Sequence, residues 1–319
     1  MARLRTPLLA VLVLAPVFGE WLSTATPPLD MLWPPGLVLV VSLYGCGALL
    51  CREIARRNGL GLTGLCLLAA AYAVFEEALV DRFWFHARPD DEGGLGHYSE
   101  VWHTNVLLAS NLTVFHIAVS IVSTVVVVEL LFPDHRQRAW VGRRGLGIAA
   151  VAFLVLPPLL YGEYTLDPLP QLIAAAVLMV ALVLVAIRLP GRPSLWESRA
   201  ETLPKRRGVA PVAFLATAAN FLLMALSDTD TPWPLALVAV LSPVLLAFLV
   251  IRTRVSGPVF GRDGLRVVSG ILGCYCLFAM GVGALGRYDL AVGAVAVVVL
   301  LWLLRRRVSS DLVRAAPQV

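Results

Sequence analysis

The chain has 319 residues, of which 59% are hydrophobic and only 15% are charged, and its mean hydropathy is +0.81. Soluble domains carry about 25% charged residues, so this composition excludes an ordinary soluble globular protein. The net charge of +5 does not indicate a nucleic-acid partner, because the arginines lie in short segments between apolar runs and not along one basic face.

Apolar runs long enough to cross a membrane follow one another from end to end. The sequence therefore predicts an all-α, polytopic membrane bundle of about ten transmembrane helices, since only helices and closed barrels satisfy their backbone groups in lipid. The predicted limits in chain order are 7–24, 35–52, 60–85, 104–131, 145–163, 168–188, 209–228, 234–252, 265–285 and 288–304. We expect a four-helix N-terminal part, residues 1–144, and a six-helix C-terminal scaffold, residues 145–319.

The distribution of Lys and Arg predicts the orientation of these helices. With the N-terminus inside, all of the 26 Lys and Arg residues except Arg82, Arg88 and Arg287 lie in or next to inner segments. This agrees with the excess of positive charge that cytoplasmic loops carry. We therefore expect a plasma-membrane protein with both termini in the cytoplasm.

The third apolar segment carries the most informative residues, Glu76 and Glu77, side by side within the run 69–80. A carboxylate in hydrocarbon costs about 2.5–3.5 kcal/mol on insertion scales, and ionisable residues inside the membrane are functional candidates. His116 on the fourth segment and Glu20 near the outer end of the first fall at a similar depth, given about 1.5 Å of rise per residue. Three helices thus place titratable groups in the outer half of the bilayer.

Helical spacing adds neighbours to these groups. Tyr72 shares a strip with Glu76, and Asp81 shares the next strip with Glu77. On the fourth segment a polar strip passes through His116, and Asn111 lies nearer the outer face. The strip consists of Thr113, His116, Ser120 and Ser123. We expect Glu20, Tyr72, Asp81, Asn111, Thr113 and Ser120 to line a cavity beside the three central residues.

Two glutamates and a histidine suit three kinds of chemistry. One is general acid–base catalysis through a bound water, with Glu76, Glu77 and His116 as catalytic residues. Another is ligation of a divalent metal such as zinc by the same three side chains. The third is proton- or cation-coupled transport. A hydrogen-bonded polar cluster that only orders the helices is the structural alternative.

The outer loop 86–103 joins the two helices that carry these residues. It contains His86, His97 and His103, whose spacing is not that of a metal site, so a solvated loop is the favoured interpretation. The same loop is in position to act as a lid over the site.

The paired glutamates and the later histidine resemble the CPBP family of glutamate intramembrane proteases, the CAAX-processing and bacteriocin-processing group. Glu76 and Glu77 match the glutamates of that family's E-E-x-x-x-R motif, and His116 follows at a similar spacing. The resemblance covers about fifty residues and implies a glutamate-dependent membrane protease.

The chain departs from this pattern in three places. Asp81 occupies the arginine position of the motif, and Arg82 comes one residue later. Leu112 replaces the phenylalanine of the family's F-x-x-x-H motif. No histidine follows His135, so the third motif is missing.

A second resemblance is to an uncharacterised polytopic membrane protein family of bacteria and archaea. It rests on the run 44–49 with Arg52-Glu53, and on Ala71-Tyr72 with Glu76-Glu77. This resemblance implies a shared membrane architecture and supplies no activity.

An enzyme acting on a membrane-accessible peptide or lipid is the favoured function, ahead of a proton- or cation-coupled transporter and a structural assembly protein. Many transporters consist of two related halves that meet at a midplane site. The last five segments here carry almost no buried charge, only Asn220 and a few serines. A catalytic N-terminal part beside a helical scaffold therefore fits the pattern better.

Overall fold

The structure is a computed structural model that describes residues 5–26, 28–85, 98–161, 168–189, 194–197, 208–228, 230–255 and 257–315. The described residues are 80% helical with almost no strand, which confirms the predicted all-α membrane bundle. Residues 86–97 of the outer loop, with His86 and His97, lie outside the described residues, as does most of the inner loop 189–208.

Ten apolar helices fall on the ten predicted segments. Eight are long and apolar enough to cross a membrane, namely Pro34–Arg57, Leu62–Val80, Val106–Leu131, Arg143–Leu160, Leu169–Arg188, Trp233–Arg254, Arg262–Ala284 and Tyr288–Ser309. The other two, Thr6–Trp21 and Val209–Ala225, are shorter. That all ten cross the membrane, with both termini on the cytoplasmic side, stays a prediction.

The first four of these helices are interrupted by π-helical segments. The first consists of α1 (Arg5–Pro16) and η2 (Val17–Trp21), and the second of α3 (Pro34–Val40), η3 (Val41–Gly45) and α4 (Cys46–Arg57). The third consists of α5 (Leu62–Val74) and η4 (Phe75–Val80), and the fourth of α6 (Val106–Phe115), η5 (His116–Ser123) and α7 (Thr124–Leu131). π-Helical turns widen a helix locally and are frequent at functional sites.

The remaining elements are regular. Two short helices, α2 (Pro28–Met31) and the 3₁₀ turn η6 (Pro133–His135), lie in connections. The other long helices are α8 (Arg143–Leu160), α9 (Leu169–Arg188), α10 (Val209–Ala225), α11 (Trp233–Arg254), α12 (Arg262–Ala284) and α13 (Tyr288–Ala315). The strands β1 (Glu100–Val101) and β2 (Thr104–Asn105) form an antiparallel hairpin with Glu100 opposite Asn105.

This hairpin fixes the start of α6. Asn105, the last residue of β2, accepts a hydrogen bond from the backbone N–H of Leu108 at 3.0 Å and so caps the helix. Ser99 donates its hydroxyl to the same Asn105 oxygen at 2.7 Å and accepts the N–H of Leu107 at 3.2 Å. The start of the helix that carries His116 is therefore fixed by these three hydrogen bonds.

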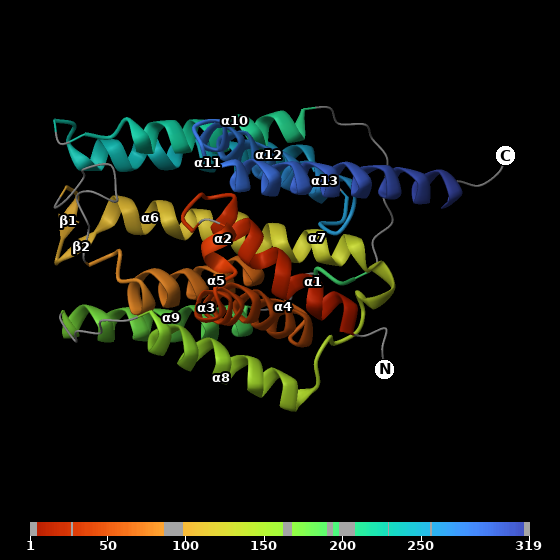
Figure 1. Cartoon of the computed structure of the whole chain (residues 1–319), viewed down its shortest axis with the longest axis horizontal. Coiled ribbons are helices and arrows are strands. Elements are labelled where there is room, and N and C mark those ends of the chain that lie inside the picture. Colours follow the sequence, from red (N-terminus) through yellow and green to blue (C-terminus); the bar gives the residue numbers. More distant parts are fainter. Residues whose placement is uncertain are drawn as a thin grey trace.

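The interrupted helices occupy the centre of the bundle. In Figure 1, α8 and α9 lie on one side of them, and α10, α11, α12 and α13 lie on the other. Between 67 and 72% of the residues in the most apolar windows of Pro34–Arg57, Leu62–Val80 and Val106–Leu131 are buried, compared with 11–33% in the last five long helices. The interrupted helices are thus shielded by protein, while the others present much of their surface to lipid.

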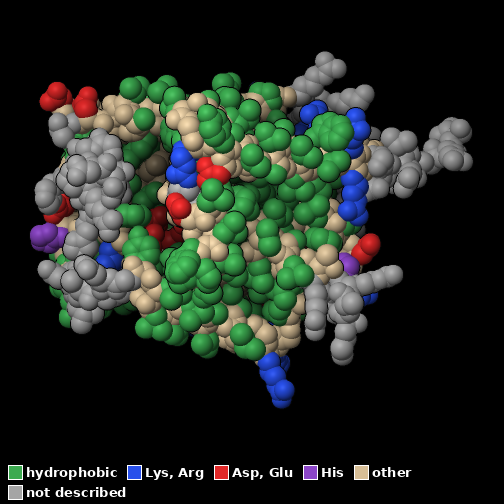
Figure 2. All heavy atoms as spheres, in the orientation of Figure 1, with side chains coloured by type: hydrophobic (Ala, Val, Ile, Leu, Met, Phe, Trp, Pro, Cys, Tyr) green, Lys and Arg blue, Asp and Glu red, His purple; other side chains and the backbone are tan. Residues whose placement is uncertain are grey.

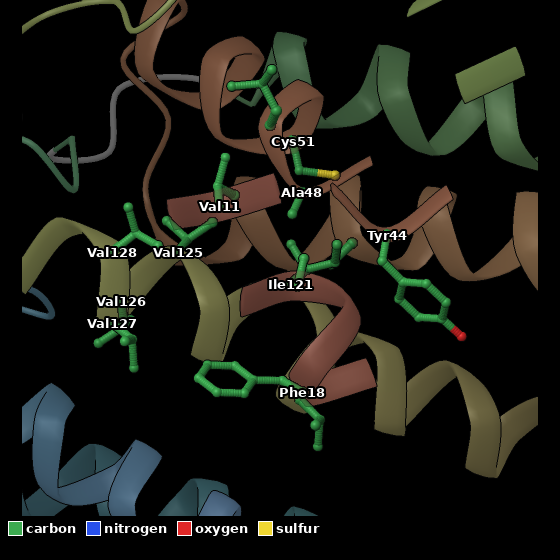
Figure 3. Packing of buried hydrophobic residues seen from close by; sticks show 14 of the residues in the cluster. Val11, Phe18, Tyr44, Ala48, Cys51, Ile121, Val125, Val126, Val127 and Val128 are labelled. Carbon is green, nitrogen blue, oxygen red and sulfur yellow. The ribbon is translucent and has the colours of Figure 1, made fainter. Parts of the chain in front are cut away.

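Buried apolar side chains hold the central helices together. Val11 and Phe18 of the first helix pack with Tyr44 and Ala48 of the second and Ile121 of η5 (Figure 3). On the outside, hydrophobic side chains cover the middle of the molecule, and Lys and Arg gather toward the end where α7 and α13 finish (Figure 2). The division of the chain at residue 144 stays a prediction.

Candidate functional site

The paired glutamates lie in η4, where α5 continues as a π-helical segment. Glu76 has an exposed fraction of 0% and Glu77 of 4%. The preceding residues of α5 are mostly small or apolar, so the helix packs closely against its neighbours up to this point. Both carboxylates are therefore held inside the bundle, away from lipid and from bulk water.

His116 is the first residue of η5 and links the two carboxylates. Its Nε2 lies 2.5 Å from Oε1 of Glu77, and its Nδ1 lies 3.2 Å from Oε2 of Glu76. The same Nδ1 is 3.0 Å from the hydroxyl of Ser120, one turn further along the helix. The imidazole, with 1% exposure, is thus oriented by Glu77 and Ser120 and faces Glu76.

Glu20 joins this group from η2. Its carboxylate lies beside the side chains of Tyr44 and Thr26 and within electrostatic range of His116. Its Oε2 is buried and accepts no hydrogen bond from any described residue. Two further helices therefore add a carboxylate and a phenol to the glutamate–histidine group.

Two tyrosine rings form the wall around the imidazole. The ring centroids of Tyr44 and Tyr72 lie 6.3 and 5.6 Å from that of His116. Two glycines make room for them, because a Cβ placed on Gly19 or Gly47 would lie 2.3 Å from the ring of Tyr44 or Tyr72 respectively. The position of each ring thus depends on a glycine in an adjacent helix.

The other predicted cavity residues differ in whether they contact the glutamate–histidine group. Asp81 donates its backbone N–H to the carbonyl of Glu76 at 2.8 Å and acts electrostatically on that residue. Thr113 donates to the carbonyl of Ala109 in its own helix at 2.7 Å. Among the described residues, no hydrogen bond joins Asn111 to the glutamates or the histidine. The structure thus brings Glu20, Tyr72, Asp81 and Ser120 to the site, but shows no polar contact to it from Asn111 or Thr113.

The three central side chains have the composition of a metal site. One donor atom each from Glu76, Glu77 and His116 lies within 4.8 Å of the others, and all three residues are buried. Carboxylate oxygens and imidazole nitrogens are both zinc ligands, and catalytic zinc sites combine three protein ligands with a fourth position left open. Ligands of one tetrahedral zinc lie about 3.3 Å apart, from bonds of about 2.0 Å, so the 2.5 Å contact of His116 with Glu77 is a hydrogen bond. Metal binding would require these two groups to separate slightly.

A second buried group of charges lies at the other end of the same helices. Arg52 and Glu53 of α4 and Glu129 of α7 each have an exposed fraction of 0%. Arg52 donates from Nε to Glu129 at 2.8 Å and from Nη1 to Glu53 at 2.5 Å. We call these three residues the inner ion cluster.

Every charge of the inner ion cluster has several partners. The guanidinium of Arg52 also donates to the carbonyls of Arg136 and Arg138 at 3.1 and 3.0 Å, and its centre lies 3.9 Å from the ring centroid of Trp140. Glu129 accepts the indole N–H of Trp196 at 2.9 Å. Glu53 accepts the backbone N–H of Trp140 at 2.9 Å and the Nε of Arg57 at 3.1 Å.

The connection after α7 completes this cluster. Arg136 lies 4.0 Å from Oε2 of Glu129 and donates to the Glu129 carbonyl at 3.2 Å. Burial lowers the pKa of the Arg136 guanidinium below its usual value, and the Glu129 carboxylate partly offsets this effect. The loop that follows α7 is therefore fastened to α4 and α7 by charge-assisted hydrogen bonds.

The model of an uncharacterized membrane protein family matches residues 8–269, which contain the glutamate–histidine group and the inner ion cluster. The chain belongs to this family. This confirms the second resemblance, and the comparisons give no support for the resemblance to the CPBP proteases. No curated protein and no solved structure matches the chain.

Membership of this family leaves the chemistry to be argued from the residues. The sequence prediction missed Tyr44 as a neighbour of the site and Glu129 as a buried charge. Glu129 had a clear signal, since it lies within the predicted segment 104–131. Tyr44 had a weaker one, because a tyrosine beside Gly45 and Gly47 in an apolar run is also common in ordinary helix packing.

Proposed function

We propose that the protein is a membrane-embedded hydrolase in which Glu76, Glu77 and His116 carry the reaction. The observation that supports this most strongly is how few hydrogen bonds the buried Glu76 carboxylate makes. Both of its carboxylate oxygens are buried, and neither makes a hydrogen bond of good geometry with a described residue. A buried carboxylate whose ion pair with Nδ1 of His116 at 3.2 Å does not meet hydrogen-bond geometry is incompletely satisfied, which is rare in native proteins and costs free energy.

We assign different roles to the two glutamates on the basis of their contacts with His116. Glu77 and Ser120 hold the imidazole of His116 from both ring nitrogens and so act as positioning residues. Glu76 faces the same imidazole and has free acceptor capacity, which suits a general base. Two like-charged groups in an apolar site differ in how readily each binds a proton, so one can act as the acid and the other as the base.

The reaction that fits is hydrolysis of an acyl bond. A water molecule attacks the carbonyl carbon of an amide or ester and gives a proton to Glu76. His116 donates a proton to the leaving amine or alcohol as the carbon–nitrogen or carbon–oxygen bond breaks. The proton on Glu76 then passes to Nδ1 of His116, 3.2 Å away, and restores the starting state. The substrate is a peptide or lipid that enters from the bilayer or from the outer face.

Two further groups assist this proposal. The hydroxyl of Tyr72 lies beside the Glu76 carboxylate, and we propose that it donates to the developing oxyanion when a substrate is bound. Glu76, Glu77 and His116 would also hold a divalent metal such as zinc, which supplies Lewis-acid activation of water when bound. In both cases the N-terminal part, residues 1–144, carries the chemistry and residues 145–319 form the scaffold, in the plasma membrane with both termini cytoplasmic.

The test is hydrolysis by the full chain reconstituted in vesicles, with fluorogenic amide and ester substrates attached to acyl chains. We expect Glu76→Gln and His116→Ala each to lower the rate by about 100-fold or more, the contribution typical of a general acid or base. Glu100→Gln, the same change in the outer hairpin β1–β2, is the matched control and should keep the rate of the unchanged protein.

Proton-coupled transport is the second candidate, supported by one observation. Titratable side chains from four helices form a continuous group from Glu20 through Tyr44 and Glu76 to His116 and Glu77, which is the composition of a proton relay. Absence of hydrolysis by the folded protein, together with proton-driven uptake that is lost in Glu77→Gln, would replace the hydrolase with this transporter. The structural-assembly alternative predicts neither activity and a loss of stability in the same variants.

A further inference from the structure

A cavity of about 770 Å³ lies between the central helices and the layer formed by α10, α11 and α12. Its lining is almost wholly apolar, with Val119, Val122 and Val126 from the central side and Val244, Ala247 and Phe248 from α11. Pockets of about 300–1,000 Å³ with apolar walls are the usual size of ligand sites in proteins. In Figure 1 the two helix layers that bound this cavity run alongside each other.

Two polar residues of the lining, Asn220 and Thr217, already donate to backbone carbonyls. Asn220 donates its amide to the carbonyl of Val240 at 2.8 Å, and Thr217 donates its hydroxyl to the carbonyl of Ala213 at 2.9 Å. Their donors are thus already used within the layer. Apolar cavities in proteins take up apolar guests, because water finds too few partners there.

One end of the cavity carries a positive charge. Arg252 lines the cavity near the C-terminal end of α11, where its side chain is exposed. It belongs to none of the ion pairs among the described residues. From Arg252 the lining continues along α11 to Val244, about 12 Å at 1.5 Å per residue. The site therefore pairs a cation at the membrane surface with an apolar space that runs into the bilayer.

Two aromatic rings form part of the cavity wall next to the glutamate–histidine group. Phe115 and Tyr275 line the cavity, with ring centroids 5.4 Å apart. The Phe115 ring also packs edge-on against His116 at 4.9 Å. The Phe115 ring thus lies between the cavity and the imidazole of the glutamate–histidine group.

We propose that this cavity binds one acyl chain of an anionic phospholipid, with the phosphate at Arg252. Basic pockets between membrane helices recognise anionic lipid head groups, and the apolar space takes the chain. The positive-inside pattern places Arg252 in the cytoplasmic leaflet, where anionic lipids are enriched. This lipid site is separate from the glutamate–histidine group and does not depend on the hydrolase proposed above.

The test is native mass spectrometry of the full chain, delipidated in neutral detergent and then mixed with phosphatidylglycerol or phosphatidylcholine. The unchanged protein should retain phosphatidylglycerol in preference to phosphatidylcholine. Ala216→Trp places a large ring in the cavity and should abolish this preference. Leu215→Trp is the matched control, because Leu215 is on the same helix with 64% exposure and does not line the cavity.

A charge variant tests the head-group contact without disturbing the fold. Arg252→Gln should weaken retention of phosphatidylglycerol by about fivefold, the effect of one basic residue at an anionic surface. Arg254→Gln, two residues away on the same helix end, should not. Equal retention by all four variants, equal retention of the two lipids by the unchanged protein, or retention of a free fatty acid in place of phosphatidylglycerol would overturn the assignment.

Discussion

Replacing Arg52 with methionine should destabilise the protein more than any change at the glutamate–histidine group. The substitution removes the partner of two fully buried carboxylates, Glu53 at 2.5 Å and Glu129 at 2.8 Å. Breaking a buried ion pair by removing one partner costs about 3–5 kcal/mol, because the remaining charge is buried without compensation. Methionine retains most of the packing volume, so the loss comes mainly from the charge.

The contacts that remain set the size of this effect. Glu129 keeps the indole N–H of Trp196, and Glu53 keeps the backbone N–H of Trp140. Each carboxylate therefore retains a hydrogen bond but loses its strongest charge-assisted one, worth about 1.5–3 kcal/mol. We expect the free energy of unfolding to fall by about 3–5 kcal/mol.

A double-mutant cycle separates this charge effect from altered packing. Glu129→Gln alone should destabilise, because it weakens the contact with Arg52. In the Arg52→Met background the same change removes an uncompensated charge, so it should stabilise the protein. We expect a coupling energy of about 2–3 kcal/mol between the two sites, within the range for residues of one network.

The assay is the free energy of unfolding of the full chain in mixed micelles, followed by loss of helical circular dichroism as the denaturing detergent increases. Arg254→Met is the matched control, since Arg254 is exposed at the end of α11 and should change stability by less than about 0.5 kcal/mol. A cost of less than about 1 kcal/mol for Arg52→Met, or additive effects in the cycle, would refute the reasoning.

Three further predictions address the glutamate–histidine group and its walls. Glu76→Gln should leave the free energy of unfolding unchanged or raise it by up to about 2 kcal/mol, because the carboxylate has no good hydrogen bond to lose; a clear loss in the same micelle assay would favour the structural-assembly alternative. Gly47→Ala should cost about 1–3 kcal/mol of unfolding free energy, because its Cβ would lie 2.3 Å from the ring of Tyr72. Gly147→Ala is the control: it has nothing within 4 Å in an exposed helix and should stabilise the protein by about 0.5–1 kcal/mol. Equal effects of the two changes would contradict the packing described. If these side chains hold a metal, analysis of the purified protein should find zinc that is lost in Glu76→Gln, Glu77→Gln and His116→Ala alike. Zinc that survives all three changes would place the metal elsewhere.

Most of the architecture could be predicted from the sequence because the bilayer imposes a simple rule. Apolar runs of about 20 residues must form helices in lipid, so the ten segments coincide with ten apolar helices in the structure. The end of the third helix was predicted less well. The predicted limit was residue 85, but the helix ends at Val80, and Arg82 adopts a left-handed φ of +62°. A backbone reversal of this kind leaves no signal in hydropathy.

The site could be predicted in part, and the reason is again physical. Glu76, Glu77 and His116 are costly in hydrocarbon wherever they occur, so their composition alone marks them. Which nitrogen meets which carboxylate depends on the π-helical segments η4 and η5, which rotate the following residues relative to a regular helix. Ideal spacing placed Thr113 on the same polar strip, but its hydroxyl bonds to its own helix at Ala109.

The two buried groups of charge in this protein differ in a way that bears on function. In the inner ion cluster, Arg52 donates to Glu53, to Glu129 and to two backbone carbonyls, so each charge is compensated and the helices are locked in register. In the glutamate–histidine group, the Glu76 oxygens and the Tyr72 hydroxyl lack good partners, although both residues are as deeply buried. The inner ion cluster is thus nearly complete, since only Oε2 of Glu129, 4.0 Å from Arg136, lacks a hydrogen bond among its described atoms. At the other end of the same central helices both oxygens of Glu76 and Oε2 of Glu20 lack one of good geometry. Because incompletely paired polar groups are costly when buried, we expect a substrate, water or ion to supply further contacts at Glu76.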